Sequence, residues 1–226
     1  MLIGILQCGH FPEELHGEVG DYGEIYQRFL TGRGFDFAVY PVCDDVFPDG
    51  ADACDGWLIS GSKHGAYEGH PWIAKLENLI RDIHASRRPL VGICFGHQII
   101  AQALGGKVEK FDGGWAIGRK DYGFADGTLA LNAWHQDQIV SPPPGAELLA
   151  SSDTCRYAAL AYGDHVFTMQ PHPEFGPPEM LGLLKVKGVD VLSEDEMAKA
   201  KADLNIPVDN PTVADRVAKF FEKVPA

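Results

Sequence analysis

The sequence predicts an α/β protein with an open, mostly parallel β-sheet, helices on both faces of the sheet and an antiparallel extension. Three observations predict this class. In the first half, short apolar runs alternate with segments of helical spacing, which favours parallel strands joined by helices. In the middle, short strand-like segments follow one another with turns between them, which indicates antiparallel pairing. The final part of the chain shows only helical spacing.

The first half contains the parallel strands and their connecting helices. Apolar or alternating runs predict strands over residues 2–6, 35–42, 56–60 and 89–93. Apolar residues at helical spacing predict helices over residues 22–30, from Pro71 onward and over 99–104. Pro71 suits the first turn of a helix, and glycines at 32, 34, 105 and 106 suit helix ends.

Residues 107–170 show short strand-like segments in place of the strand-helix alternation, and the residues after 177 show helical spacing. Short strands are expected over residues 118–122, 128–133, 157–162 and 166–170. After residue 177, Ser193 and Glu196 have the spacing of a capping box, and an apolar helix face carries Val213, Val217, Phe220, Phe221 and Val224. We expect one domain over residues 1–226, with residues 177–226 as a helical segment packed on it.

Composition excludes several classes of partner. The 226 residues include 32 acidic and 19 basic side chains, a formal net charge of −13, so the field of the protein repels nucleic acid and anionic membranes. Neither is an expected partner. The start of the chain lacks a basic segment and reads as a strand, not a signal peptide, and no apolar run approaches the length of a membrane span.

The cysteines indicate a reducing compartment and no metal. Five cysteines are odd in number, scattered and without the paired spacing of a zinc site, which favours free thiols in the cytoplasm. A metal site built from Cys8, His10 and His16 is a weak alternative, because the residues between them have no ligand-loop pattern.

The segment 92–98, Gly-Ile-Cys-Phe-Gly-His-Gln, places Cys94 between two glycines where a strand gives way to a helix. A sharp strand-to-helix turn is so crowded that the residues two before and two after its tip must be small, as in the nucleophile elbow of hydrolases. A helix N-terminus also favours a thiolate. A buried structural cysteine is the competing interpretation, but it does not explain both Gly92 and Gly96.

A thiolate that attacks an acyl group needs a base, and His172 is the best of the nine histidines. It follows a predicted strand and stands between two prolines, and Pro173 biases it toward extended backbone. Glu174, two residues on, then lies on the same side and can accept the ring N–H. On spacing alone, an exposed loop that carries His172 and Glu174 is an equally good interpretation. His97, although close to Cys94, lies in the first helical turn and need not face it.

These two segments resemble motifs of the class I glutamine amidotransferases, a Cys-His-Glu family. Residues 92–98 look like the family's Gly-x-Cys-x-Gly-x-Gln motif, and residues 171–174 look like its His-Pro-Glu motif. The resemblance spans residues 1 to about 180 and implies a flavodoxin-like open sheet. It implies that Cys94 is the nucleophile, His172 the general base and acid, and Glu174 the orienting carboxylate.

The resemblance also implies an oxyanion hole and substrate contacts. The hole is expected from the backbone N–H groups of Gly61 and Phe95, although this chain has Ser62 and Lys63 where many relatives continue with glycine and proline. Bound glutamine is expected to contact Gln98 and the backbone around the segment that contains His135, Gln136 and Asp137. For that segment, a strand end with polar residues is the simpler interpretation.

The function implied is hydrolysis of a γ-glutamyl amide through a cysteine thioester, which releases glutamate with ammonia or an amine and needs no metal or organic cofactor. The chain looks closest to free-standing members similar to the glutaminase part of GMP synthase and to γ-glutamyl peptidases. Two versions stay open: a glutaminase that passes ammonia to a synthetase subunit, and a self-sufficient peptidase acting on glutathione-like peptides or conjugates. A non-catalytic binding module on the same fold is the alternative from another class, although such a module has no need of all three triad residues.

Overall fold

A nine-stranded sheet lies at the centre of the computed structural model, which describes residues 1–223. Its strand order is β2-β1-β3-β4-β11-β10-β9-β6-β7, and a separate two-stranded sheet pairs β5 with β8. The strands are β1 (Leu2–Gln7), β2 (Asp36–Pro41), β3 (Gly56–Ile59), β4 (Leu90–Ile93), β5 (Lys107–Lys110), β6 (Ala116–Phe124), β7 (Gly127–His135), β8 (Asp137–Ser141), β9 (Ala146–Ser151), β10 (Ala159–Tyr162) and β11 (Val166–Met169).

The sheet is parallel at one end and antiparallel at the other. Strands β2, β1, β3, β4 and β11 are parallel neighbours, and β10, β9, β6 and β7 continue the sheet in antiparallel pairs. β3 and β4 are buried along their whole length, as expected for strands covered on both faces. The predicted α/β fold with an antiparallel extension is confirmed.

The position of β11 differs from the prediction, which placed it in the antiparallel extension. It pairs antiparallel with β10 but also lies parallel to β4, in the middle of the sheet. Gly163, at φ 63°, makes the tight turn of the β10–β11 hairpin. Val166, Thr168 and Met169 are fully buried, which favours a central place over an edge. The end of β11 therefore lies beside the end of β4.

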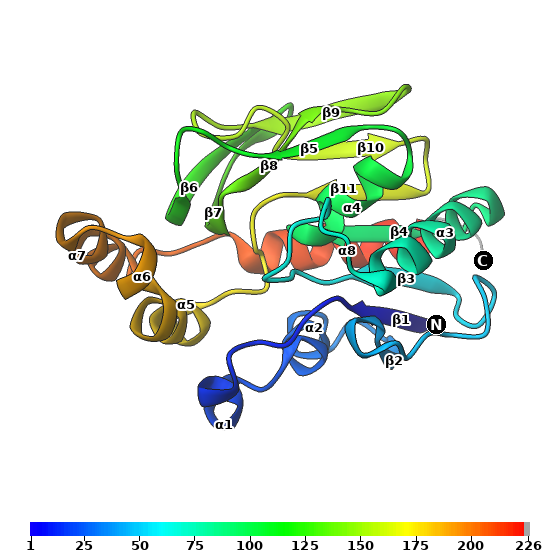
Figure 1. Ribbon diagram of the computed structural model, residues 1–226, viewed down its shortest axis with the longest axis horizontal. Helices are drawn as coiled ribbons and strands as arrows, with labels where there is room; N and C mark the ends of the chain where they lie inside the picture. The colour runs from blue at the N-terminus through cyan, green and yellow to red at the C-terminus, as the bar shows by residue number, and fades with distance from the viewer. Residues whose placement is uncertain (224–226) are drawn as a thin grey trace.

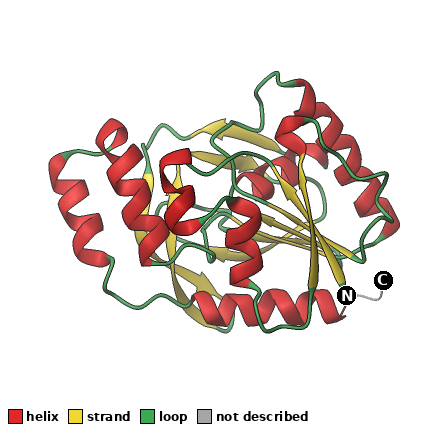
Figure 2. Cartoon of the chain, turned by 90° about the horizontal axis from the view of Figure 1, so that it is seen from below, coloured by secondary structure: helices red, strands yellow, loops and turns green. Residues whose placement is uncertain are grey.

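Helices cover both faces of the sheet (Figures 1 and 2). One apolar cluster joins Ile3 and Ile5 of β1 to residues of α2 and α8, and a second joins Trp57 and Ile59 of β3 to residues of α3 and α4. The helical segments are η1 (Glu13–Leu15), α1 (His16–Val19), α2 (Tyr22–Phe29), η2 (Val42–Asp44), α3 (Pro71–Ser86), α4 (Phe95–Ala103), α5 (Pro177–Leu183), η3 (Leu184–Gly188), α6 (Val189–Val191), α7 (Glu194–Asp203) and α8 (Asn210–Lys223).

The C-terminal part of the described chain is helical, as predicted. The Ser193 capping box is present at the start of α7, and α8 buries Val213, Val217 and Phe221. Figure 1 shows α5, α6 and α7 together at one end of the molecule. Residues 224–226, including the predicted contact of Val224, lie outside the described part of the chain. Within residues 1–223, no helix is both long and apolar enough to cross a membrane.

Candidate active site

Cys94 stands at the tip of a turn that only glycines can flank. It follows β4 and caps the N-terminus of α4, with φ 53° and ψ −103°, a strained conformation for a residue with a side chain. A Cβ atom on Gly92 would lie 2.6 Å from the Gly96 carbonyl oxygen, and one on Gly96 would lie 2.3 Å from the Ile59 carbonyl oxygen. The structure therefore accounts for both glycines, and this strained turn holds the Cys94 side chain at the carboxyl end of the sheet.

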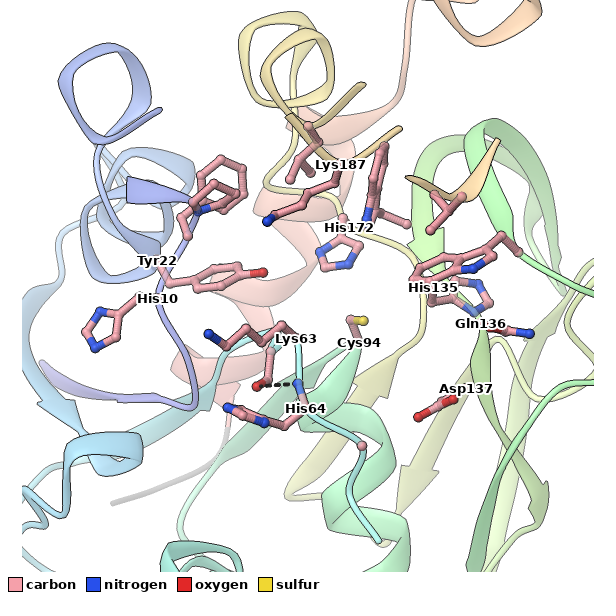
Figure 3. Close-up of a pocket in the computed structure, with 18 of the residues that line it drawn as sticks. His10, Tyr22, Lys63, His64, Cys94, His135, Gln136, Asp137, His172 and Lys187 are labelled. Carbon is pink, nitrogen blue, oxygen red and sulfur yellow. Dashed lines mark hydrogen bonds between the residues drawn. The ribbon is translucent and has the colours of Figure 1, made fainter. Parts of the chain in front are cut away.

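His172 and Glu174 lie together after β11. The His172 ring is 2% exposed, and its Nδ1 donates a hydrogen bond to Glu174 Oε1 at 2.7 Å. The ring stacks on Phe175 with 4.1 Å between centroids, and the His172 backbone N–H donates to the Asn132 carbonyl at 2.8 Å. Because β11 lies beside β4, the imidazole comes next to Cys94 at the edge of one cavity (Figure 3).

The charges of the three side chains are coupled. Burial lowers the pKa of His172, whereas the negative charges of Cys94 and Glu174 beside it raise the pKa, and the net result is an increase to about 10. The imidazole, which lies between Cys94 and Glu174, is therefore suited to hold a proton at neutral pH. This arrangement can transfer a proton between His172 and a group bound at Cys94.

Tyr26 of α2 connects Glu174 to the loop after β3. Its hydroxyl is buried, donates to Glu174 Oε1 at 2.7 Å and accepts from the Gly61 backbone N–H at 3.3 Å. A Cβ atom on Gly61 would lie 3.0 Å from His172 Cε1, so this loop packs directly against the imidazole. Tyr26 thus fixes the carboxylate and the loop in one network.

The same network includes one of the backbone amides that we predicted as oxyanion donors. The Gly61 N–H that we predicted for this role is engaged with Tyr26. The next amide, that of Ser62, donates no hydrogen bond within residues 1–223, and Ser62 lines the cavity. The Phe95 N–H also has no acceptor among these residues. The amides of Ser62 and Phe95 are therefore without an acceptor among the described residues, as is that of Lys63.

His135, Gln136 and Asp137 lie on one side of Cys94 (Figure 3), and Gln98, which lines the same cavity, is hydrogen-bonded to this segment. Gln98 Nε2 donates to the Asp137 carbonyl at 2.8 Å and to Gln170 Oε1 at 3.1 Å, while its Oε1 accepts no hydrogen bond from the described residues. Gln136 Nε2 donates to the Phe111 carbonyl at 3.2 Å, and burial raises the pKa of the Asp137 carboxyl. Gln98 therefore anchors the wall through its nitrogen and leaves its oxygen for a ligand.

His135 is a buried histidine in the same wall. It is 4% exposed, and neither ring nitrogen has a hydrogen-bond partner among the described residues. Burial first, and the neighbouring His172 second, lower the pKa of His135 to about 3, so the ring stays neutral. A buried polar group without a partner is costly, which points to a ligand contact at this position.

The other histidines have structural partners. His97 is fully buried and donates from Nε2 to the Tyr157 carbonyl at 2.8 Å, and burial lowers its pKa to about 4. Its Nδ1 lies 2.7 Å from Thr168 Oγ1, so both ring nitrogens have partners, and His97 does not line the cavity in the described structure. The weak metal set of Cys8, His10 and His16 is not assembled, because Cys8 Sγ donates to the Leu6 carbonyl and His16 Nε2 donates to the Phe11 carbonyl.

Two other groups of side chains bring metal-ligand atoms together. His10 lies 2.9 Å from Asp44 and 3.7 Å from Cys43, and its Nδ1 is held by Asp21 at 2.6 Å. Glu68 Oε2 lies 3.0 Å from His64 Nδ1 and 2.8 Å from His70 Nε2. In both groups the nitrogen and oxygen atoms already hydrogen-bond one another. The sequence pattern predicted neither of these two groups.

Sequence reasoning missed Tyr22, Tyr26 and Lys187. The two tyrosines lie at helical spacing among apolar residues, so the pattern marked them only as core. Tyr22 lines the cavity, with its hydroxyl directed into it (Figure 3), and Lys187 reaches the cavity from η3. No local signal identifies these roles, because each depends on which elements pack around the carboxyl end of the sheet.

Comparison with known proteins identifies related chains. Residues 21–185 match the family model for glutamine amidotransferase class-I. The chain is 29% identical over 222 residues to γ-glutamyl peptidase 3 of Arabidopsis thaliana, covering 90% of this chain and 89% of that one. It is 32% identical over 170 residues to a glutamine-hydrolysing GMP synthase subunit of Halobacterium salinarum, covering 71% and 87%. A glutamine amidotransferase structure from Methylobacillus flagellatus shares the fold, with a TM-score of 0.79, 22% identity and coverage of 100% and 95%.

Proposed function

The chain belongs to the class-I glutamine amidotransferase family, and from this premise we propose that it hydrolyses γ-glutamyl amides with Cys94 as nucleophile, His172 as general acid and base and Glu174 as the carboxylate that orients the imidazole. The family match and the related peptidase and glutaminase chains support hydrolysis of γ-glutamyl amides. The observation that carries the residue roles is the coupled site, with His172 held by Glu174 and next to Cys94.

The reaction has two halves. Cys94 sulfur attacks the side-chain carbonyl carbon, a C–S bond forms, and the carbonyl oxygen becomes an oxyanion. As the C–N bond breaks, His172 gives its proton to the departing amine or ammonia. Water then attacks the thioester, His172 takes a proton from it, and the C–S bond breaks to release glutamate and restore the enzyme.

The oxyanion is held by backbone amides. We propose that the Phe95 and Ser62 N–H groups donate to it, since both are free, whereas the Gly61 N–H is engaged with Tyr26. Each such donor contributes about 3 kcal/mol to the transition state. Gln98 Oε1 and the wall formed by residues 135–137 bind the γ-glutamyl group on the other side of the sulfur.

Replacement of Cys94 tests the proposal. Cys94→Ala removes the sulfur and keeps the Cβ atom, so the backbone strain is unchanged and the protein stays folded while release of glutamate falls to the background rate. Melting temperature and glutamate release are measured together. Substantial turnover by the folded variant would refute the role of Cys94.

A self-sufficient peptidase is the version of this function that we favour. The similarity to γ-glutamyl peptidase 3 spans about nine tenths of both chains, whereas that to the GMP synthase relative spans 71% of this chain. The isolated protein is expected to cleave γ-glutamyl peptides faster than glutamine.

A glutaminase that delivers ammonia to a synthetase subunit is the second candidate, and the GMP synthase relative favours it. It predicts weak hydrolysis of every substrate by the isolated chain and stimulation by a partner. A non-catalytic binding module predicts instead that Cys94 does not react with a diazo-ketone analogue of glutamine, which intact-protein mass spectrometry detects. The free thiols of all five cysteines support a reducing cytoplasm as the site of action.

A further inference from the structure

The cavity at Cys94 offers room for more than glutamine. Its volume is about 800 Å³, within the range of about 300–1,000 Å³ that accommodates drug-sized ligands. Figure 3 shows Cys94 and His172 between two groups of side chains, with residues 135–137 on one side and Tyr22 and Lys63 on the other. If the γ-glutamyl group occupies the first side, the leaving amine extends into the second.

Two lysines from distant parts of the sequence reach this second side. Lys63 lies in the loop after β3, and Lys187 lies in η3. In Figure 3 the amino groups of both lysines lie on the same side of Cys94 as Tyr22. The leaving-group side of the cavity therefore carries two cations supplied by separate elements.

Both amino groups are free to bind an anion. The lysine salt bridges within residues 1–223 are made by Lys75, Lys107 and Lys199, and none involves Lys63 or Lys187. An unpaired ammonium at the wall of a cavity gains from a carboxylate ligand, because it gives up little solvation and breaks no existing ion pair.

The carboxylates around Lys63 and Lys187 restrict which anions can bind to the two amino groups. Glu13, Glu14 and Asp190 also line the cavity and are exposed, and Glu68 is held by His64 and by a second histidine. These carboxylates, together with the net charge of −13, repel anions in general. An anionic ligand is therefore favoured only where its charge comes close to the two amino groups.

The position of Lys187 depends on an unusual helix. Residues 184–188 form a π-helical segment between α5 and α6, a feature that occurs often at functional sites. Leu183, Lys187 and Val191, each four residues apart, all line the cavity. The family match ends at residue 185, so Lys187 belongs to a wall beyond the part of the chain that the family model covers.

We propose that Lys63 and Lys187 form a subsite for a carboxylate on the leaving amine, so that the preferred substrates are γ-glutamyl peptides with a free C-terminal carboxylate. This inference rests on the proposed γ-glutamyl hydrolysis at Cys94. The bond changes are those given above, with the peptide amine as the leaving group that takes the proton of His172. The subsite lowers the KM for such peptides and leaves the chemistry at the sulfur unchanged.

A matched pair of substrates tests the subsite. γ-Glutamyl-alanyl-glycine and its C-terminal amide differ only in the charge of the leaving group, and glutamine serves as the third substrate. For the wild-type protein, we expect kcat/KM for the acid to exceed that for the amide at least tenfold, with most of the difference in KM. Added salt should reduce this ratio, because the contact is electrostatic.

Three single-residue variants test which lysines bind the carboxylate of the leaving amine. Lys187→Met and Lys63→Met should each reduce the acid-to-amide ratio about fivefold, the size expected for a solvent-accessible ion pair. Lys185→Met is the control, because Lys185 lies on the same helical segment, is exposed and does not line the cavity in the described structure. Its ratio should equal that of the wild type.

The outcomes separate the two proposals. Cleavage of acid and amide at equal rates by the wild type, or an unchanged ratio in both lysine variants, overturns the subsite while the hydrolytic function stands. Failure of the wild type to cleave any of the three substrates overturns the proposed function itself. A ratio that falls equally in the Lys185 variant would show a general effect of surface charge and would also overturn the subsite.

Discussion

Replacement of Tyr26 by Phe removes one hydroxyl from the centre of the catalytic network. In the wild type, Glu174 Oε1 accepts from Tyr26 and from His172 Nδ1, each at 2.7 Å, and Glu174 Oε2 has no partner in the described residues. Phe keeps the aromatic ring and its stacking on Tyr22, whose centroid lies 6.3 Å away. The variant leaves the buried carboxylate with a single donor.

The expected effect follows from the strength of that hydrogen bond. A hydrogen bond to a charged group contributes about 1.5–3 kcal/mol, and about 1.4 kcal/mol corresponds to a factor of ten in rate. We therefore expect kcat for Tyr26→Phe to fall about 10- to 100-fold, because Glu174 no longer holds the imidazole in one orientation. Tyr26 does not line the cavity in the described structure, so KM should change less than about twofold.

The assay measures kcat, KM and the free energy of unfolding for the variant and for a matched control. Tyr122→Phe is that control, because Tyr122 is also fully buried but its hydroxyl has no hydrogen-bond partner in residues 1–223. It should keep the wild-type kcat. A Tyr26→Phe protein that loses stability but keeps its kcat would refute the reasoning, since the hydroxyl would then be only structural.

Three further predictions concern the turn, the triad and a buried histidine. Gly96→Ala places a methyl group against the Ile59 carbonyl and should destabilise the fold by about 1–3 kcal/mol, measured by chemical denaturation; an unchanged midpoint would contradict the crowded turn. Glu174→Gln removes one of the two anions that raise the pKa of His172, so the alkaline decline of kcat/KM, expected near pH 10 in the wild type, should move to lower pH. The folded-state pKa of His97 is lowered by burial to about 4, so its contribution to stability is present above about pH 6.5 and is lost as the pH falls through about 4. His97→Leu should therefore flatten the dependence of the unfolding free energy on pH between about 6.5 and 4. An unchanged slope in that range would contradict this prediction.

The fold was predictable because its signals are local. Apolar runs and helical spacing marked β1 to β4 and their helices, and the crowding around Cys94 explains the two glycines that the sequence showed. The place of β11 was not predictable from its own residues, because pairing beside β4 is a long-range contact. Without that pairing, the sequence alone could not decide between a catalytic histidine and an exposed loop.

The sequence by itself determined the tight turn at Cys94 and the alternation of strands and helices from β1 to α4, since both follow from backbone sterics and the spacing of apolar residues along the chain. It did not predict β5, β8 and β9, which are short strands of the antiparallel region. Only the tertiary structure decided which groups meet at the carboxyl end of the sheet. Packing of α2 brings Tyr26 to Glu174 and engages the Gly61 amide, and the π-helical turn of η3 brings Lys187 over the cavity. Contacts between segments so far apart have no local pattern, because their energy is gained only when the whole sheet and its helices assemble.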